Sequence, residues 1–281
     1  MPVERPQHIE TQDPKYFAFQ REVYLAWALW AVASFLLILA GQIGLILSLV
    51  TLGVLILGTA LRIYHKLQVE QVRHYWQTEA LFSIYSTLRI EHPLPPMRLW
   101  AASPDFLVLS LSLIRRHKPQ VIFEVGSGVS TVLAAYCLRD QGGGQIISLE
   151  HETRFADNTR DNLVAHGLDS YATVYHAPLL AQSIDDDIWL WYDLSRLNDL
   201  PSIDMLVVDG PPEDTQTMAR YPALPLLFAK LNPGAYILVD DFIRDDEYAM
   251  VNRWLETFDL SVVQTYANEK GAVILQKGRH L

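Results

Sequence analysis

Residues 121–131 read VIFEVGSGVST, and this stretch decides the fold. The apolar run Val121–Val125 predicts a short strand, and the residues from Ser130 onward predict a helix. Gly126 and Gly128 lie between the two, where glycine lets the backbone turn tightly and approach a ligand. The first turn of the helix presents free N–H groups at the same point. Dinucleotide-binding folds share this turn, so by itself it does not identify the ligand.

The chain after this stretch alternates between apolar runs and helical stretches. Further strands are predicted at 145–149, 172–176, 205–208 and 235–239, and helices at 130–139, 153–166, 215–231 and 244–258. Short strands separated by helices predict an α/β fold, a Rossmann-like, mostly parallel sheet with helices on both faces. The alternation of strands and helices ends at residues 260–266 and 271–276. These two runs predict a C-terminal β-hairpin with an antiparallel last strand.

The N-terminal part of the chain has a different composition. Residues 24–61 contain no charged residue, no histidine and no proline, and 29 of the 38 positions are apolar. As one helix they would be about 57 Å long, against a hydrocarbon core of about 30 Å. The sequence Gly-Gln-Ile-Gly at 41–44 supplies a break, so we expect two spans, 24–40 and 44–61. A buried hairpin inside a soluble protein, or one that enters a single leaflet, are the alternatives.

The basic residues indicate the orientation of this transmembrane hairpin. Arg62, His65 and Lys66 follow the second span, and Lys15 and Arg21 precede the first. The positive-inside rule therefore places both ends, and the catalytic domain, on the cytoplasmic side of a membrane. The predicted order is a cytoplasmic segment (1–23), the hairpin (24–61), a connecting helix and loop (62–104) and the main domain (105–281).

Charge and cysteine content exclude two classes of function. The chain of 281 residues has a formal net charge of −10, so it lacks the basic surface expected of a nucleic-acid-binding protein. Cys137 is the one cysteine, which allows no internal disulfide and no paired-cysteine metal site. Its apolar surroundings favour a buried structural thiol over a reactive nucleophile.

Three features narrow the choice among folds with a glycine-rich turn. Glu124 lies two residues before the first glycine, and Glu150 ends the second strand, where it could accept hydrogen bonds from ribose hydroxyls. The third feature is the terminal hairpin, which ordinary dinucleotide-binding domains lack. A nicotinamide-dependent oxidoreductase would need the glycine loop and Glu150, but it would not explain the hairpin.

The motifs EVGSGVST, SLEH, HAPL, WYD, VDGPP followed by RYP, and VDD resemble those of class I S-adenosylmethionine-dependent methyltransferases, in the group of the macrocin and catechol O-methyltransferases. The resemblance runs from about Leu94 to Lys277. It implies that the turn residues hold the methionine part of the cofactor, that Glu150 holds the ribose, and that two histidines border the adenine. The implied cofactor-binding residues are Glu124, Gly126, Ser127, Gly128, Ser130, Thr131, Glu150, His151, His176, Ala177 and Asp209.

Three acids follow the fourth and fifth strands, and they bear on the mechanism. Asp209, Asp240 and Asp241 should converge, because the carboxyl ends of parallel strands meet at the ligand crevice. Three carboxylates suit Mg²⁺, which prefers oxygen ligands and could activate an acceptor hydroxyl. The catechol and macrocin enzymes, which the chain resembles here, place metal-binding acids after the same strands. The catechol enzyme has a lysine base three residues after its first metal acid, where this chain has Pro212. The alternative assigns Asp209 to the cofactor side and the other two to a turn or helix cap.

Each residue that could line the acceptor site could instead have a purely structural role. Arg220-Tyr221-Pro222, Arg244 and the Trp191–Asp193 loop are candidates, although Trp191 could be core and Arg244 part of a solvated face. Asp185–Asp187 is most simply a solvated loop. We predict Asp209, Asp240 and Arg244 as the catalytic set.

The leading hypothesis is a membrane-anchored S-adenosylmethionine-dependent O-methyltransferase, with Mg²⁺ as a second cofactor if the acids bind it. The tether points to an acceptor at the membrane: a small molecule, a sugar or a lipid-linked hydroxyl. The alternatives are the nicotinamide oxidoreductase and a non-catalytic membrane-anchored scaffold with a Rossmann-like fold. The partners expected are the bilayer, the acceptor and, optionally, further copies of the chain.

Overall fold

The computed structural model describes residues 15–39, 41–98, 100–185, 187–195, 197 and 200–279. Most of the predicted N-terminal segment (residues 1–14) and the last residue of the first predicted span, Ala40, lie outside these ranges. The chain divides into two compact units, one ending at Trp76 and one beginning at Gln77, and each is described by itself.

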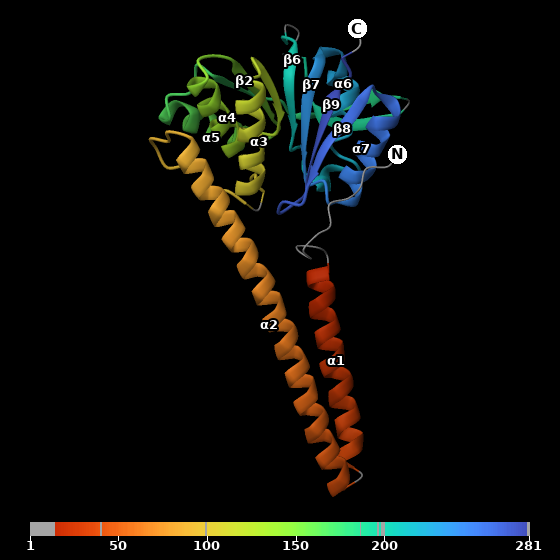
Figure 1. Cartoon of the computed structure of the whole chain (residues 1–281). Helices are drawn as coiled ribbons and strands as arrows, with labels where there is room; N and C mark the ends of the chain where they lie inside the picture. Colours follow the sequence, from red (N-terminus) through yellow and green to blue (C-terminus); the bar gives the residue numbers. More distant parts are fainter. Residues whose placement is uncertain are drawn as a thin grey trace. The chain divides into compact units, whose positions relative to one another are not determined.

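The N-terminal unit is built from two helices that lie side by side (Figure 1). They are α1 (Lys15–Ile38) and the first part of α2 (Gln42–Thr87), with Gly41 between them in a left-handed conformation at φ +87°. Ser34 and Ser48 are buried between the helices, and the Trp30 indole N–H donates to Thr51 Oγ1 at 3.1 Å. Small residues let two apolar helices approach closely. Among the described residues, α2 alone is long and apolar enough to cross a membrane, and residues 22–36 form a shorter apolar helix.

The second unit contains a seven-stranded mixed sheet with the order β3-β2-β1-β6-β7-β9-β8. Strands β1 (Val121–Val125), β2 (Gln145–Glu150), β3 (Ala172–His176), β6 (Ile203–Val208) and β7 (Leu231–Asp240) are parallel. Strand β9 (Ala272–Lys277) is inserted between β7 and β8 (Leu260–Tyr266) and is antiparallel to both. The predicted fold class, including the terminal hairpin, is therefore confirmed.

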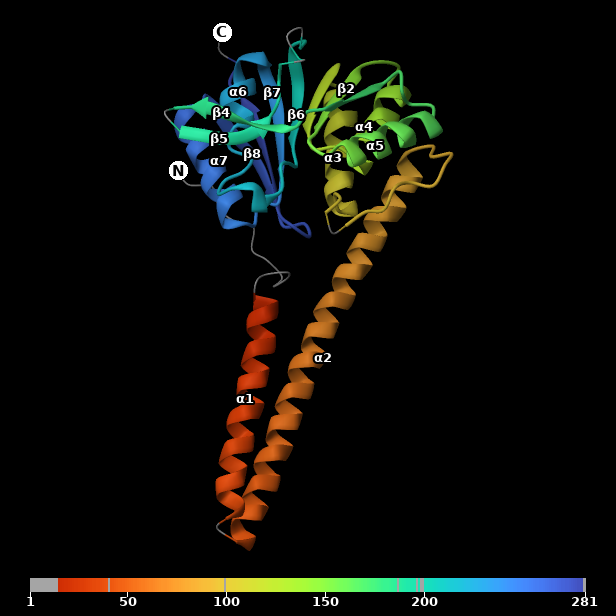
Figure 2. The same ribbon diagram turned by 180° about the vertical axis from the view of Figure 1, so that it is seen from behind.

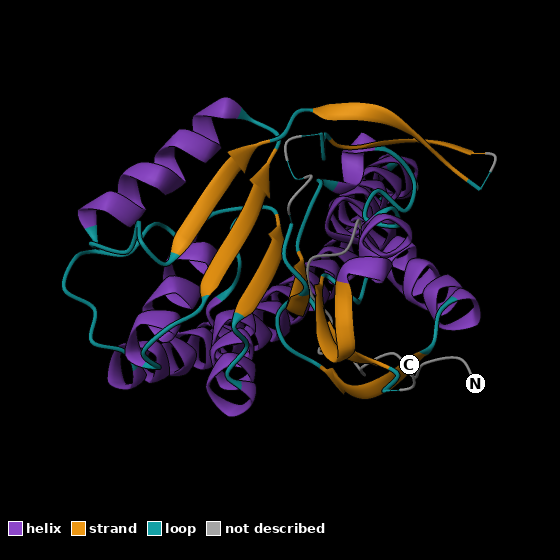
Figure 3. Ribbon diagram, turned by 90° about the horizontal axis from the view of Figure 1, so that it is seen from above, coloured by secondary structure: helices purple, strands orange, loops and turns teal. Residues whose placement is uncertain are grey.

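Helices cover both faces of this sheet, as the end-on view shows (Figure 3). One face packs on α3 (Pro104–His117), α4 (Val129–Asp140) and α5 (Thr153–Ala165), and the other on α6 (Ala223–Leu227) and α7 (Asp245–Thr257). In β1, Ile122 belongs to the first core and Phe123 and Val125 to the second. A strand buried on both faces must be apolar throughout, which is why residues 121–125 contain no alternating polar positions apart from Glu124.

Two predictions of secondary structure were wrong. The helix predicted over 215–231 is broken into a 3₁₀ turn, η1 (Glu213–Thr215), the short α6 and a second 3₁₀ turn, η2 (Phe228–Lys230). Pro222 lies inside the predicted range, directly before α6, and a proline disfavours helix in the residue before it, so no continuous helix runs from residue 215 into α6.

The Trp191–Asp193 loop was also predicted wrongly, because Trp191 and Tyr192 belong to a strand. Strands β4 (Leu179–Ile184) and β5 (Asp187–Tyr192) form a separate two-stranded antiparallel sheet, labelled in Figure 2. Trp189 and Trp191 on its inner face are buried in the second core, so Trp191 has the structural role that was its alternative. Asp185 makes the turn at φ +49°, as a loop residue would.

Candidate functional site

A cavity of about 1010 Å³ opens at the carboxyl ends of the parallel strands. The turn after β1, the end of β2 and the turn after β6 all line it, which is the position of the ligand crevice in an open α/β sheet. Pro95, Pro96 and Trp100, from the segment before α3, line another part of its wall, and the Trp100 side chain is 82% exposed. The cavity is thus bounded by the sheet, by α5 and by the segment that precedes α3.

The glycine turn is shaped by two different requirements. Gly126 has φ +100°, and a Cβ there would lie 3.0 Å from the backbone oxygen of Asp209, so no other residue fits without strain. Gly128 has an extended backbone, and a Cβ there would meet no protein atom within 4 Å. Both residues line the cavity. Gly126 therefore serves the packing of β1 against β6, whereas the space beside Gly128 is left for a ligand.

Glu124 lies beneath this turn and does not line the cavity. Its side chain is 1% exposed, and its Oε2 accepts hydrogen bonds from the hydroxyls of Thr131 and Ser148. Burial raises the pKa of Glu124 to about 7, and the hydroxyl hydrogen bonds only partly oppose that rise. Thr131 Oγ1 also accepts from the Gly128 N–H at 3.1 Å. The carboxyl group consequently fixes the start of α4 and the shape of the turn.

Glu150 lies at the cavity wall, at the end of β2. Its Oε2 accepts from the Ser127 hydroxyl at 3.3 Å and its Oε1 from the Glu152 N–H at 3.1 Å. His151 Nδ1 lies 3.0 Å from Glu150 Oε1, and this contact raises the pKa of His151. Each carboxylate oxygen keeps room for another donor. The side chain could therefore accept hydrogen bonds from a diol in the cavity.

The structure divides the predicted cofactor residues into two groups. Seven of them line the cavity: Gly126, Ser127, Gly128, Ser130, Glu150, His151 and Asp209. Four do not: Glu124, Thr131, His176 and Ala177. His176 Nε2 contacts Thr153 Oγ1 at 3.1 Å and the His151 carbonyl at 3.2 Å, and Ala177 is 2% exposed. These four support the turns around the cavity.

The three predicted metal ligands lie together. One carboxylate oxygen from each of Asp209, Asp240 and Asp241 falls within 4.8 Å of the others. Asp209 and Asp241 line the cavity, whereas Asp240 is fully buried behind them. Glu247, on α7, is a fourth acid beside the cluster and was not predicted.

Three cations surround these acids. Arg220 Nη2 lies 2.6 Å from Asp241 Oδ2 and 3.4 Å from Asp209 Oδ1. Arg244 Nη1 lies 3.1 Å from Asp241 Oδ2, and Lys270 Nζ lies 4.0 Å from Asp241 Oδ1. Asp241 is thus the acid that the cations neutralise. Burial alone would raise the pKa of Asp241, but the guanidinium groups of Arg220 and Arg244 bring it below its usual value.

The other two acids are less well compensated. Burial raises the pKa of Asp209 to about 6, although Arg220 lowers it. Burial and the neighbouring Asp241 and Asp209 carboxylates raise the pKa of Asp240 well above its usual value. Both carboxylate oxygens of Asp240 are buried without a hydrogen-bond partner. An unpartnered buried carboxyl is costly, which indicates a missing proton or a missing cation at this point.

These observations test whether the residues fit a divalent cation. Asp240 has both oxygens free and Asp209 makes one long contact, so this pair offers oxygen ligands to a hard cation such as Mg²⁺. Asp241 Oδ2 is already paired with two guanidinium groups, which leaves it a weaker ligand. The donor set fits a cation held chiefly by Asp209 and Asp240.

Lys270 was not predicted to line the cavity, whereas Tyr192 belongs to the Trp191–Asp193 stretch that was a candidate for the acceptor site. Lys270 comes from the turn between β8 and β9, and the pairing of Ala272 with Asp240 places that turn beside the carboxyl end of β7. Tyr192 is 1% exposed and also lines the cavity, and a Cβ on Gly210 would lie 2.5 Å from its hydroxyl oxygen. The sequence predicts the hairpin but not the register in which β9 pairs with β7, and that register is what brings Lys270 to the cavity.

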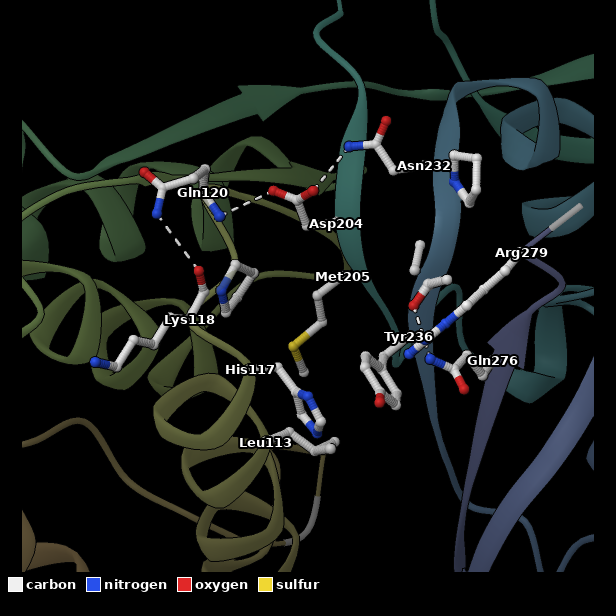
Figure 4. A pocket seen from close by; sticks show the side chains of 14 residues that line it. Leu113, His117, Lys118, Gln120, Asp204, Met205, Asn232, Tyr236, Gln276 and Arg279 are labelled. Carbon is white, nitrogen blue, oxygen red and sulfur yellow. Dashed lines mark hydrogen bonds between the residues drawn. The ribbon is translucent and has the colours of Figure 1, made fainter. Parts of the chain in front are cut away.

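A second cavity, of about 370 Å³, lies at the opposite end of the strands (Figure 4). Its polar side chains bond mainly to the protein: Asp204 accepts from the N–H groups of Gln120 and Val121 and from Asn232 Nδ2. The His117 ring lies against Tyr236 with centroids 4.0 Å apart. The Asp204 carboxylate therefore has a structural role, because it holds the backbone at the start of β1. The larger cavity remains the candidate site.

Comparison with known proteins identifies the domain that holds this site. Residues 123–242 match a family model described as a methyltransferase domain. This chain carries a methyltransferase domain. The match favours a methyltransferase over the oxidoreductase alternative. The matched range of the methyltransferase domain begins in β1 and ends after Asp241, so it contains the glycine turn and the acid cluster.

Solved structures of other proteins share the fold of the methyltransferase domain. The O-methyltransferase TomG from Streptomyces achromogenes, solved in complex with SAM, has a TM-score of 0.52 at 17% identity over 73% of this chain and 98% of its own. An O-methyltransferase from Bacillus cereus, solved in complex with SAH, has a TM-score of 0.50 at 17% identity over 72% of this chain and 90% of its own. No curated protein matches the chain.

Proposed function

We propose that the chain transfers a methyl group from S-adenosylmethionine to a hydroxyl of a small-molecule, sugar or lipid-linked acceptor. The observation that carries this proposal is the cavity itself. The glycine turn and Glu150 lie on one side of it, and the acid cluster with Arg244 lies on the other. A methyl donor and an acceptor could thus meet between them, and residues 105–281 would form the catalytic domain.

The cofactor is assigned to the side of the cavity next to β1 and β2. Gly128 leaves open space, Glu150 has acceptor capacity for the ribose hydroxyls, and Ser127 and Ser130 add hydroxyl groups. The structurally similar TomG and Bacillus cereus enzymes were solved with SAM and SAH, which supports this choice of ligand. The protein's contribution would be to orient the methyl group and exclude water, because the transfer is an in-line displacement.

We assign Asp209, Asp240 and Arg244 to the acceptor side. Arg244 lines the cavity with its side chain 31% exposed, so it could orient a polar acceptor. Asp209, with a pKa of about 6, is a carboxylate at neutral pH that could take the proton from the acceptor hydroxyl. Mg²⁺ bound to Asp209 and Asp240 would lower the pKa of that hydroxyl and so ease the transfer.

The role of the cation is tested with Asp240→Asn and with chelation. We expect excess EDTA to abolish methyl transfer and added Mg²⁺ to restore it, and Asp240→Asn to lose the Mg²⁺ dependence together with the activity. Cofactor affinity, measured by calorimetry, should change little, because Asp240 does not line the cavity. Full activity in excess EDTA would refute the metal role and leave Asp209 and Arg244 as the acceptor-side residues.

We also propose that residues 24–61 attach the chain to a membrane as two spans, with the domain on the cytoplasmic side. The exposed apolar surface of α1 and α2 supports this: Leu29 is 71% exposed, Ile43 75% and Val54 68%. Apolar surface of this extent is covered by lipid or by a partner. Deletion of residues 1–61 should convert the protein from detergent-requiring to soluble. Full-length protein that fractionates as soluble without detergent would contradict the membrane attachment.

A further inference from the structure

The helix α2 exposes a regular stripe of side chains on the part that follows the uncharged run. The positions recur at alternating intervals of three and four residues, the spacing of a coiled-coil seam. They are Leu61, Tyr64, Gln68, Gln71, Tyr75, Thr78, Phe82 and Tyr85, and we name them the α2 seam. Tyr64 is 62% exposed, Tyr75 66% and Phe82 72%, so exposed aromatic rings lie toward both ends of the stripe, with Gln68 and Gln71 between them.

The opposite side of the same helix is the side that the chain itself buries. Gln77 is 6% exposed, and Ile84 is fully buried. Gln77 donates to Asp105 Oδ2 at 2.7 Å, which ties this side to the start of α3. These buried positions lie about half a turn away from the α2 seam, since each residue advances the helix by about 100°.

We propose that the α2 seam pairs with the α2 seam of a second copy of this chain, as a parallel two-stranded coiled coil. A seam with a 4–3 repeat is complementary to itself, whereas lipid would require no such repeat beyond the uncharged run. The parallel direction rests on the proposed membrane attachment, because both copies would enter the bilayer in the same orientation.

The charges on α2 are compatible with this partner. Residues 61–87 contain five charged side chains, and Arg62, Lys66, Glu70 and Arg73 lie away from the seam. Glu79 borders it, and in a parallel pair the residue across from it is His74 of the second copy. The flanking pair Leu67 and Val72 is apolar on both sides. No like charges would meet, so a second copy meets no electrostatic penalty.

The surface available is sufficient for a stable pair. An aromatic side chain buries about 150–250 Å² in full, so rings half to two-thirds exposed leave about 100 Å² each. Together with the leucine and the glutamines of the seam, two copies would bury on the order of 1,200 Å² outside the uncharged run, the lower end of stable interfaces.

Cysteine cross-linking in membranes tests this proposal. In a Cys137→Ser background, mild oxidation of Gln71→Cys should give a covalent dimer, because a disulfide needs Cα atoms about 4.4–6.8 Å apart. Ile63→Cys is the matched control: Ile63 is also exposed, at 47%, but lies outside the seam. Equal cross-linking of both variants, or of neither, would overturn the proposal.

A second measurement separates this interface from the catalytic proposal. The double variant Tyr75→Arg and Phe82→Arg changes only exposed rings, so it should halve the mass measured in detergent while leaving cofactor affinity unchanged. A wild-type protein that is already monomeric in detergent and in vesicles, or that pairs only with a different protein, would refute the dimer. Loss of cofactor binding in the wild-type chain would instead count against the proposed function.

Discussion

The two glycines of the turn after β1 should respond to alanine in opposite ways. In Gly126→Ala, the side chain is forced into φ +100° and its Cβ lies 3.0 Å from the Asp209 carbonyl oxygen. A left-handed backbone costs an L-residue about 1–2 kcal/mol, and overpacking adds about 1–3 kcal/mol. We expect unfolding free energy to fall by roughly 2–5 kcal/mol, which is about 5–15 °C in the thermal midpoint for a domain of this size.

Gly128→Ala should leave the fold intact and weaken the binding of the cofactor. Its Cβ meets no protein atom within 4 Å, and removing a glycine from the unfolded chain contributes about 0.4–1 kcal/mol in favour of the fold. The methyl group would instead enter the space that we assign to S-adenosylmethionine. We expect cofactor affinity to fall at least tenfold, about 1.4 kcal/mol, with an unchanged or slightly higher thermal midpoint.

The assay compares both variants with the wild type by thermal unfolding and by calorimetric titration of S-adenosylmethionine, with the full chain in detergent. We expect Gly126→Ala to lower the thermal midpoint and Gly128→Ala to lower the affinity for S-adenosylmethionine. If Gly128→Ala binds the cofactor as tightly as the wild type, the turn is not the cofactor site. If it unfolds as early as Gly126→Ala, the backbone argument fails.

Three further predictions concern charged side chains of the site. Glu150→Ala should weaken cofactor binding by about 1.5–3 kcal/mol, and unchanged affinity in a folded variant would remove Glu150 from the site. For Glu124, the pKa rises from 4.5 to about 7 on folding, so its contribution to stability is present below pH 4.5 and lost as pH rises through about 7, up to about 3 kcal/mol. Glu124→Gln should flatten the stability profile between these pH values, and an unchanged slope, measured by denaturant unfolding, would show that Glu124 does not titrate there. Arg220→Met should destabilise the chain by about 3–5 kcal/mol because Asp241, 3% exposed on its side chain, loses its closest partner. Mg²⁺ should restore part of that loss if the acids bind it, and identical thermal midpoints with and without Mg²⁺ would argue against such binding.

The sequence predicts the parallel strands and the terminal hairpin because their signals are local. Val121–Val125 and Ala235–Val239 are apolar runs too short for helices, and the glycine turn marks the exit of the first. The same logic placed Asp209 and Asp241 at the cavity, since both follow such runs. Short apolar runs that end in functional residues are therefore enough to locate this end of the sheet.

The features that local signals missed depend on tertiary structure. The segment 215–231 has helical composition, but Pro222 interrupts it directly before α6, and the effect of this proline was underestimated. The β4–β5 hairpin is defined by the burial of Trp189 and Trp191 against the second core, which a single strand does not reveal. Lys270 reaches the acids because β9 enters the sheet between β7 and β8, and strand order cannot be deduced from the strands alone.

The insertion of β9 also determines when the protein is most vulnerable during its synthesis. β7 ends at Asp240 and its neighbour β9 ends at Lys277, 37 residues later in the chain. At about 5–20 residues per second, the ribosome needs roughly 2–7 s to cover that distance. Throughout this interval the edge of β7 formed by Ile237, Leu238 and Val239 has no partner strand. An unpaired apolar edge is a template for aggregation, so codon changes that slow translation between residues 241 and 277 should lower the yield of folded protein more than equal delays elsewhere.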